Sequence, residues 1–215
     1  MTQIYLVRHC ESLSNRYHSF AGRADMDISA KGRLQLECLS EYFKDKKIDK
    51  IYTSSLIRAR KTAEAINKYH DCEIEIDDAF IEINLGKLDG RPVSDMTDEQ
   101  IFLWNMQPHK FYVKGGETME QVANRAYEGI LKIVRENPNK TVAIASHGCV
   151  IRNLMRIFKG FAFTGLKEVD WCDNTGVNII VASGDSFFID TENFIGHLSP
   201  DAAAVPITSW LGDNE

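Results

Sequence analysis

The sequence predicts an α/β sandwich with a mostly parallel central sheet. Short apolar runs typical of buried strands alternate along the chain with amphipathic segments typical of helices, and this alternation indicates strand–helix–strand units. The 215 residues contain no internal repeat and no Pro-, Ser- or Gly-rich linker, so we expect a single domain over residues 1–215. A chain of this length buries about 70% of its unfolded surface, enough to fold without disulfides or metals.

Charge and composition argue against several classes of partner. The 25 Lys and Arg residues against 31 Asp and Glu give a net charge of −6, which makes nucleic acid and anionic membranes poor partners. No apolar run approaches the roughly 18 residues that span a bilayer. The first apolar run, residues 4–7, meets Arg8 and His9 at once, unlike a signal peptide. The five cysteines form no CxxC pair, so we expect reduced thiols and a cytoplasmic location.

The first half of the chain predicts two strand–helix pairs. Residues 3–7 are an apolar, β-favouring run that stops at a charged pair, as a buried strand does where it enters a loop. Residues 31–44 follow as a helix, and 48–53 as a second strand. The serines at 54–55 can cap a helix that runs to about residue 69. The apolar stripes expected for the two helices are Leu34, Leu36, Cys38, Leu39, Tyr42 and Phe43, then Leu56, Ala59, Ala63 and Ile66.

The second half continues the alternation. Residues 73–78 predict a strand with one solvated acidic face. Thr118 and Gln121 form a capping-box pattern that opens a helix, which the Asn-Pro-Asn sequence at 137–139 ends. Residues 141–145 are the clearest strand. The remaining elements are a helix at 149–158 and strands at 177–182 and 187–189, and the inward face of the capped helix is Val122, Ala126, Ile130 and Ile133.

Side chains able to bind an anion follow three of the predicted strands. Arg8 and His9 follow the first, Arg58 lies just inside the helix after the second, and His147 follows the strand at 141–145. Because function in such sheets sits at the carboxyl ends of the strands, we expect these residues to meet. A neutral histidine can attack phosphorus, while two arginines and a second histidine bind the non-bridging oxygens. Phosphoryl transfer asks mainly for positioning and charge neutralisation, so such a site can work without a metal.

The residues of these loops resemble the histidine phosphatase superfamily, which includes the cofactor-dependent phosphoglycerate mutases. LVRHCESLSN at 6–15 is similar to the RHG-E-[ST]-x-x-N signature of that family, SSLIRARKTA at 54–63 is similar to its SSxxRAxxTA segment, and SHG follows at 146–148. The blocks occur in the family's order over most of the first 160 residues. The resemblance implies a three-layer α/β/α sandwich of the phosphoglycerate mutase-like type.

The resemblance also implies roles. His9 would be the nucleophile that becomes phosphohistidine, and Glu82 matches the position of the family's proton donor. Glu82 would protonate the leaving oxygen and then act as base for the water that hydrolyses phosphohistidine. This requires a protonated Glu82 beside a neutral His9, hence a raised carboxyl pKa or a mildly acidic optimum. The catalytic set is then His9, Glu82 and His147, and the phosphoryl-binding set is Arg8, Asn15, Gly22, Arg58 and His147.

Position 10 departs from the family signature, because it holds Cys where the signature has Gly. A side chain there would be expected to narrow the pocket or to shift the loop. Cys149 follows the second histidine motif, so two thiols are expected near the site. Redox regulation is a hypothesis for such a pair, against the more common use of buried cysteines as plain hydrophobes.

A phosphatase is the favoured interpretation. In the mutases that the resemblance brings to mind, the segment after the acid is longer and carries an arginine pair, whereas here no arginine occurs between Arg91 and Arg125. The GGET sequence at 115–118 resembles the phosphatase branch. We therefore expect hydrolysis of a small phosphomonoester through phosphohistidine, with no metal and no other cofactor. Mutase-type transfer and a phospho-ligand-binding module with little turnover are the alternatives.

Residues 91–114 are expected to form a helical flap that faces the substrate and packs its aromatic side chains on the core. Lys110 and Lys114 could meet a second anionic group of the substrate. The remaining histidines match no metal-ligand spacing. The phosphoester and the oligomeric state stay open, a homodimer included, and residues 207–211 of the tail could dock on the domain or cover the site.

Overall fold

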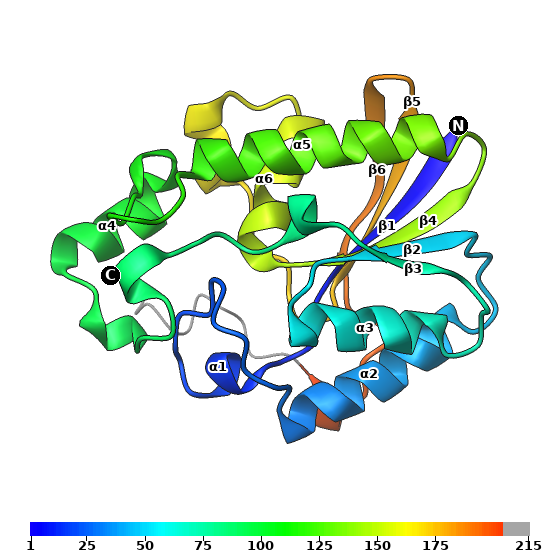
Figure 1. The fold of residues 1–215 in the computed structure, drawn as a ribbon, viewed down its shortest axis with the longest axis horizontal. Coiled ribbons are helices and arrows are strands. Elements are labelled where there is room, and N and C mark those ends of the chain that lie inside the picture. The colour runs from blue at the N-terminus through cyan, green and yellow to red at the C-terminus, as the bar shows by residue number, and fades with distance from the viewer. Residues whose placement is uncertain (204–215) are drawn as a thin grey trace.

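The computed structural model describes residues 1–203, which form three layers (Figure 1). The middle layer is a six-stranded sheet with the order β3-β2-β4-β1-β5-β6. Helices α2 and α3 cover one face of the sheet, and α5 and α6 cover the other. The predicted α/β/α sandwich is therefore confirmed. The strands are β1 (Thr2–Arg8), β2 (Lys50–Thr53), β3 (Ile74–Ile76), β4 (Thr141–Ser146), β5 (Val177–Ser183) and β6 (Ser186–Phe194).

Six α-helices are described within residues 1–203. They are α1 (Leu13–Arg16), α2 (Ala30–Phe43), α3 (Ile57–Asn67), α4 (Asp98–Met106), α5 (Met119–Glu136) and α6 (Gly148–Phe158). Short 3-10 helices lie at Asp78–Phe80, Gly86–Leu88, Val93–Asp95, Pro108–Lys110, Phe163–Glu168 and Pro200–Ala202. None of the described helices is long and apolar enough to cross a membrane.

The pairing of the strands brings three chain segments to one edge of the sheet. β1 pairs in parallel with β4, β4 with β2, and β2 with β3, while β5 runs antiparallel to β1 and to β6. In this register Arg8 is opposite Ser146, and Thr53 is opposite Ala145. The residues that follow β1, β2 and β4 therefore emerge side by side, as the sequence predicted.

Alternation along the strands builds a core on each face. In β1, Ile4 and Leu6 join the core under α5 and α6, whereas Tyr5 and Val7 join the core under α2 and α3. The same alternation holds in β4. The four predicted inward residues of α5 are all fully buried: Val122, Ala126, Ile130 and Ile133.

The buried face of α2 differs from the predicted stripe. Leu34 is 42% exposed, whereas Gln35 is completely buried together with Leu39 and Phe43. The spacing of three to four residues puts Gln35 on the face that packs inward. Its side-chain oxygen accepts from the Glu11 N–H at 2.8 Å, so burying this amide carries no unpaired-acceptor penalty.

The predicted serine cap of α3 is wrong. The helix begins at Ile57, the N-cap position is Leu56, and no side chain caps it. Ser54 instead forms a hydrogen bond with His147, and the Ser55 N–H donates to Asp78. By contrast, the capping box of Thr118 on α5 is present as predicted.

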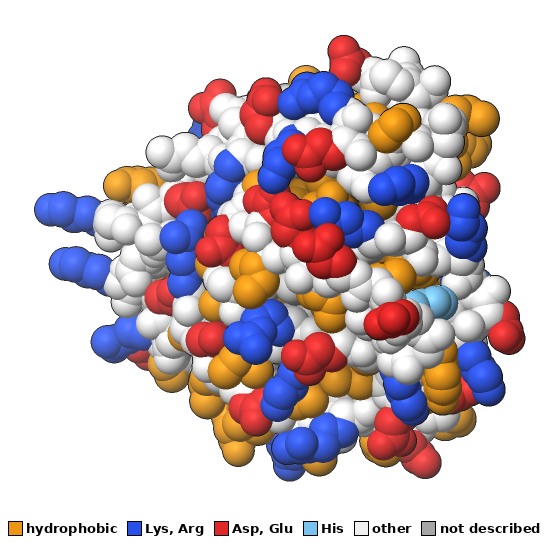
Figure 2. Space-filling view, turned by 45° about the vertical axis from the view of Figure 1, so that its right-hand side comes forward, with side chains coloured by type: hydrophobic (Ala, Val, Ile, Leu, Met, Phe, Trp, Pro, Cys, Tyr) orange, Lys and Arg blue, Asp and Glu red, His pale blue; other side chains and the backbone are white. Residues whose placement is uncertain are grey.

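The segment 91–114 lies beyond the carboxyl edge of the sheet, with α4 as its helix (Figure 1). Trp104 and Phe111 pack inward, whereas Phe102 is 48% exposed, so only part of its aromatic content joins the core. On the face shown in Figure 2, acidic and basic side chains are interspersed. The predictions for residues 207–211 fall outside the described part of the chain.

Candidate active site

A cavity of about 80 Å³ opens at the carboxyl edge of the sheet. Loops after β1 and before α5 contribute to it together with the first turn of α6. Its polar lining is Arg8, His9, Asn15, Ser19 and Glu82. Its other lining residues are Phe20, Ala21, Ile83, Leu85, Val93, Trp104, Gly148, Cys149 and Trp171.

His9 directly follows β1 and is buried. Its backbone N–H donates to the Ser146 carbonyl at 2.9 Å, which extends the pairing of β1 with β4. Its Nδ1 lies 2.7 Å from the Cys10 carbonyl oxygen. Because a carbonyl only accepts, Nδ1 carries the proton and the neutral ring keeps its lone pair on Nε2. Burial and the charges of Arg58 and Arg8 lower the pKa of His9 well below its usual value, so the ring is neutral and Nε2 is free to act as a nucleophile.

His147 directly follows β4 and lies beside His9, with 5.1 Å between the ring centroids. Its Nε2 is 2.7 Å from the hydroxyl oxygen of Ser54, the residue after β2, and this contact orients the ring. Burial, Arg58 and His9 lower the pKa of His147 well below its usual value. A neutral ring that accepts from Ser54 at Nε2 has its donor at Nδ1, which can bind an anionic oxygen.

Arg58 is fully buried in the first turn of α3. Its Nη1 donates to the Ala24 carbonyl at 2.9 Å, and its Nη2 donates to the carbonyls of Ala21 and Gly22 at 2.8 Å. Within residues 1–203 it forms no ion pair, so carbonyl dipoles hold the guanidinium without neutralising its charge. A buried cation held in this way favours an anionic ligand.

Three buried donors around His9 have no hydrogen-bond partner among residues 1–203: Arg8 Nε, Arg58 Nε and His147 Nδ1. Buried polar atoms are normally paired, so each of these calls for an explanation. Arg8 is held by its Nη1, which donates to the Cys172 carbonyl at 2.6 Å. Together, the two cations and one neutral donor can neutralise and orient a phosphoryl group.

Glu82 lines the cavity and is only 8% exposed. Its carboxylate accepts from the Ile83 N–H at 2.8 Å and from the Cys149 N–H at 3.2 Å. Burial raises the pKa of Glu82, against the effect of the two N–H groups and of Arg58. A neutral histidine and a carboxyl with a raised pKa thus share one cavity, as acid-assisted attack on a phosphomonoester requires.

The comparison with known families decides the identity of this arrangement. Residues 4–194 match the model of the histidine phosphatase superfamily, branch 1. The chain belongs to this family. The predicted class of enzyme, a histidine phosphatase that hydrolyses phosphomonoesters, is confirmed.

Relatives of this histidine phosphatase include phosphatases and a mutase. It is 36% identical over 161 residues to the uncharacterized phosphatase PhoE of Bacillus subtilis, covering 74% of this chain and 79% of that protein. It is 32% identical over 184 residues to phosphoserine phosphatase 1 of Hydrogenobacter thermophilus, covering 84% and 86%. It is 28% identical over 164 residues to the probable phosphoglycerate mutase GpmB of Salmonella choleraesuis, covering 74% and 76%.

The fold of this histidine phosphatase is also that of a solved structure, Bacillus stearothermophilus YhfR. The TM-score is 0.88 at 29% sequence identity, and the match covers 93% of this chain and 100% of that chain.

Asn15 and Gly22 of the histidine phosphatase are placed differently with respect to the cavity. Asn15 lines it, and its Oδ1 accepts from the Ser12 N–H at 3.0 Å. Gly22 is not among the lining residues; its carbonyl binds Arg58, and a Cβ at this position would lie 2.4 Å from the Ile83 carbonyl oxygen. Gly22 therefore shapes the loop that holds Arg58.

The side chain at position 10 does not narrow the cavity. Cys10 is completely buried beside α3, its N–H donates to Thr62 Oγ1 at 3.1 Å, and it is absent from the cavity lining. Cys149 does line the cavity, as predicted. Burial raises the pKa of Cys10 to about 12 and that of Cys149 well above its usual value. Both are thus protonated thiols at neutral pH, which argues against ready oxidation.

The predicted flap at 91–114 contains Trp104 of the aromatic cavity wall, but the sequence did not predict that Phe20 and Trp171 join it. Trp104 stacks on Trp171 with ring centroids 5.5 Å apart and an angle of 16°, and it meets Phe20 edge to face at 5.7 Å. The guanidinium carbon of Arg152 lies over the Trp171 ring, 4.5 Å from its centroid, and helps to hold the ring in place. These aromatics come from three segments without a shared period, so no pattern along the chain could have joined them.

Proposed function

We propose that this histidine phosphatase hydrolyses small phosphomonoesters with an uncharged, apolar or aromatic leaving group. The observation that carries this proposal is the composition of the cavity wall: around the nucleophile lie Phe20, Leu85, Val93, Trp104 and Trp171. Apolar and aromatic walls with a few placed polar groups are typical of sites for small apolar molecules. A flap role for residues 91–114 is supported by Val93 and Trp104, which belong to that wall.

In the first step, the Nε2 of His9 attacks phosphorus and the bond from phosphorus to the leaving oxygen breaks. The protonated carboxyl of Glu82 gives its proton to that oxygen, so the alcohol leaves neutral. The proton stays on Nδ1 of His9 and is donated to the Cys10 carbonyl oxygen, and this hydrogen bond orients the ring and stabilises the positive charge of phosphohistidine. The neutral His9 and the raised pKa of Glu82 support this assignment.

In the second step, Glu82 acts in the opposite sense. Its carboxylate takes a proton from water while the water oxygen attacks the phosphorus of phosphohistidine. The bond from phosphorus to Nε2 of His9 breaks and its electron pair returns to the ring, so phosphate leaves, His9 is again neutral, and Glu82 is again protonated.

Binding of the transferring phosphoryl group falls to Arg8, Arg58 and His147 in this proposal, with Asn15 adding a contact. The support is that each of the first three has a buried nitrogen without a partner among residues 1–203. Charge-assisted hydrogen bonds from such donors strengthen as negative charge builds up on the equatorial oxygens. Gly22 contributes through the loop that holds Arg58.

The charge distribution of the cavity favours an apolar ester over phosphoserine or phosphoglycerate. Each of these has a carboxylate beside the phosphoester, and a carboxylate requires its own cationic or N–H partners. Lys110 and Lys114, predicted as candidates, are exposed and are not among the lining residues. Among the described lining residues, Arg8 is the sole Lys or Arg, and it is assigned here to the phosphoryl group. No further cation of the lining is then left for a carboxylate.

The test is phosphate release from a panel that contains 1-naphthyl phosphate, phosphoserine and 3-phosphoglycerate, with and without EDTA. We expect EDTA-resistant release, highest kcat/KM for 1-naphthyl phosphate, loss of turnover in His9→Ala, and unchanged turnover in the control His70→Ala, since His70 does not line the cavity. Preference for phosphoserine would contradict the apolar substrate class. Transfer between positions of phosphoglycerate would favour the mutase alternative, and no release from any ester would favour a binding module.

Location and assembly stay predictions. We infer a cytoplasmic protein from its composition, with neither nucleic acid nor membrane as partner, and leave a homodimer open. Size-exclusion chromatography with light scattering decides the oligomeric state.

A further inference from the structure

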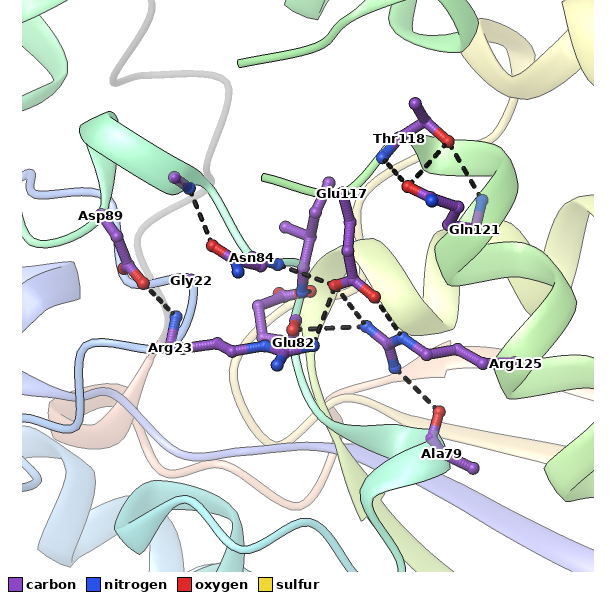
Figure 3. A network of polar contacts seen from close by, with 12 residues as sticks. Gly22, Arg23, Ala79, Glu82, Asn84, Asp89, Glu117, Thr118, Gln121 and Arg125 are labelled. Carbon is purple, nitrogen blue, oxygen red and sulfur yellow. Dashed lines mark hydrogen bonds and ion pairs between the residues drawn. The ribbon is translucent and has the colours of Figure 1, made fainter. Parts of the chain in front are cut away.

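Glu117 lies in the turn before α5 and joins three segments around the site (Figure 3). Its Oε1 accepts from Arg125 Nε at 2.9 Å. Its Oε2 accepts from Arg125 Nη2 at 3.2 Å, from Arg23 Nη2 at 3.1 Å and from the Asn84 N–H at 2.9 Å. A single carboxylate thus receives four hydrogen bonds, none of which the chemistry of the cavity requires directly.

Glu117 and Arg125 form hydrogen bonds with backbone groups on both sides of Glu82. Arg125 donates to the Ala79 carbonyl at 2.9 Å and to the Glu82 carbonyl at 3.3 Å. On the other side, the Glu117 carboxylate binds the Asn84 N–H, and the Glu117 N–H donates to the Asn84 carbonyl at 2.8 Å. The segment that carries Glu82 is therefore held before and after this residue by one ion pair.

Two further features tie the turn to the site. A Cβ on Gly116 would lie 2.4 Å from the Asn84 carbonyl oxygen, so only glycine permits the close approach that forms these bonds. Arg23 belongs to the loop whose carbonyls hold Arg58, and its N–H donates to Asp89 at 2.7 Å. The carboxylate of Glu117 thus connects the Glu82 segment with the loop around Arg58.

The ion pair between Glu117 and Arg125 is bidentate and largely shielded from solvent, so it can fix the position of the segment that carries Glu82. The side chains of Arg125 and Glu117 are 20% and 18% exposed. Burial opposes ionisation of Glu117, but its bonds to Arg125 and Asn84 hold its pKa below the usual value, so the carboxylate is charged at neutral pH. Bidentate arginine–carboxylate pairs of this kind fix geometry as well as charge.

We propose that Glu117 is a positioning residue for Glu82: it fixes the backbone on both sides of the acid and neutralises Arg125 behind it. This inference rests on the proposed role of Glu82 as proton donor. The charged and titratable groups that act on Glu82 come from four elements: Arg8 of β1, Arg58 of α3, Arg125 of α5 and Cys149 of α6. Of these, Arg125 is the cation that Glu117 neutralises.

The test compares two aromatic esters that differ in their need for an acid. p-Nitrophenolate leaves without protonation, whereas the alkoxide of benzyl phosphate requires a proton donor. We expect Glu117→Gln to lower kcat/KM for benzyl phosphate about tenfold and that for p-nitrophenyl phosphate less than about twofold. Because the ratio of the two values is independent of the active fraction, partial misfolding cannot imitate it. Glu120→Gln, an exposed residue in the first turn of the same helix, is the matched control.

The pH profile gives a second readout. Without the negative charge of Glu117, the charge of Arg125 stabilises the Glu82 carboxylate and lowers its pKa. The alkaline limb of kcat/KM for benzyl phosphate should then move to lower pH in Glu117→Gln and stay in place in Glu120→Gln.

Glu82→Gln, measured in parallel, distinguishes failure of the positioning role of Glu117 from failure of the proposed role of Glu82. If it loses benzyl phosphate hydrolysis while Glu117→Gln and Glu117→Ala behave like the control, the positioning role is wrong and the proposed function stands. If Glu82→Gln keeps the ratio of the two esters, the assigned acid is wrong, and the role of Glu117 falls with it.

Discussion

The two ends of the cavity are built by different means. At the phosphoryl end, His9 and His147 follow neighbouring strands and Arg58 lies in the first turn of α3. Backbone carbonyls fix His9 and Arg58, and the Ser54 hydroxyl fixes His147. At the leaving-group end, Trp104 comes from α4 and Trp171 from the loop before β5, and the two rings stack on each other. Directional bonds on a sheet edge give precise placement, whereas packed aromatics give shape.

This difference indicates that chemistry and substrate choice are separable in this enzyme. Groups on the sheet edge inherit their spacing from the strand register, which every member of such a fold must keep. The aromatic wall can be repacked without moving that edge, since volume-conserving changes of apolar residues are tolerated best. Substitutions at the two ends should therefore have different signatures.

The largest effect is expected from Glu82→Gln at the phosphoryl end. Loss of the proposed proton donor should lower kcat/KM for benzyl phosphate by about 10²–10⁴ and leave the inhibition constant of the product phosphate unchanged. Steady-state kinetics on folded protein, checked by circular dichroism, measure this. An equal loss for p-nitrophenyl phosphate would indicate damage to the whole site and would break the proposed separation.

A smaller and different effect is expected from Trp104→Ala at the leaving-group end. The ratio of kcat/KM for 1-naphthyl phosphate to that for a small alkyl phosphate should fall about tenfold, as loss of an aromatic contact and its buried area implies. Removing this buried indole should also cost about 3–5 kcal/mol of stability, so Trp104→Phe serves as the milder version. Phe102→Ala, on an exposed position of α4, is the control. An unchanged ratio in both Trp104 variants would contradict the assigned wall.

The pH dependence of stability gives a further test of the phosphoryl end. Burial raises the folded pKa of Glu82 above 4.5, so the folded state favours the neutral acid. The protonated Glu82 therefore makes its full contribution to the free energy of unfolding below pH 4.5, and this contribution is lost as pH rises through the folded pKa. Compared with Glu82→Gln, the wild-type protein should therefore lose stability between pH 4 and pH 8. Urea unfolding at several pH values measures it, and a constant difference would contradict a raised pKa.

The smallest effect is expected from Cys10→Gly, which restores the family signature. Because Cys10 packs beside Thr62 and does not line the cavity, kcat/KM should change by no more than about twofold, which is under 1 kcal/mol in the barrier. Peroxide treatment of the wild-type enzyme should also leave activity unchanged, because burial raises the pKa of Cys10 and of Cys149 and keeps both thiols protonated. A clear gain in rate with glycine would show that the side chain disturbs the phosphate loop.

Much of the fold and of the phosphoryl end could be predicted from the sequence. The strand at 141–145 and the capped helix after Thr118 follow from local patterns, and their polar ends follow from the parallel sheet. The prediction failed where a polar group found a distant partner. Ser54 resembled a helix cap but binds His147, 93 residues away, and Gln35 is buried because Glu11 pairs with it.

The sequence by itself determined the layers, the order of the motifs and the meeting of Arg8, His9, Arg58 and His147 at one edge. These depend on period, capping and chain direction, which are local properties of a chain. Only the tertiary structure decided which way Cys10 points, what Gly22 packs against, and which side chains enclose the leaving group. Those depend on close packing and on hydrogen bonds between segments far apart in the chain, and no spacing along the sequence encodes such distances.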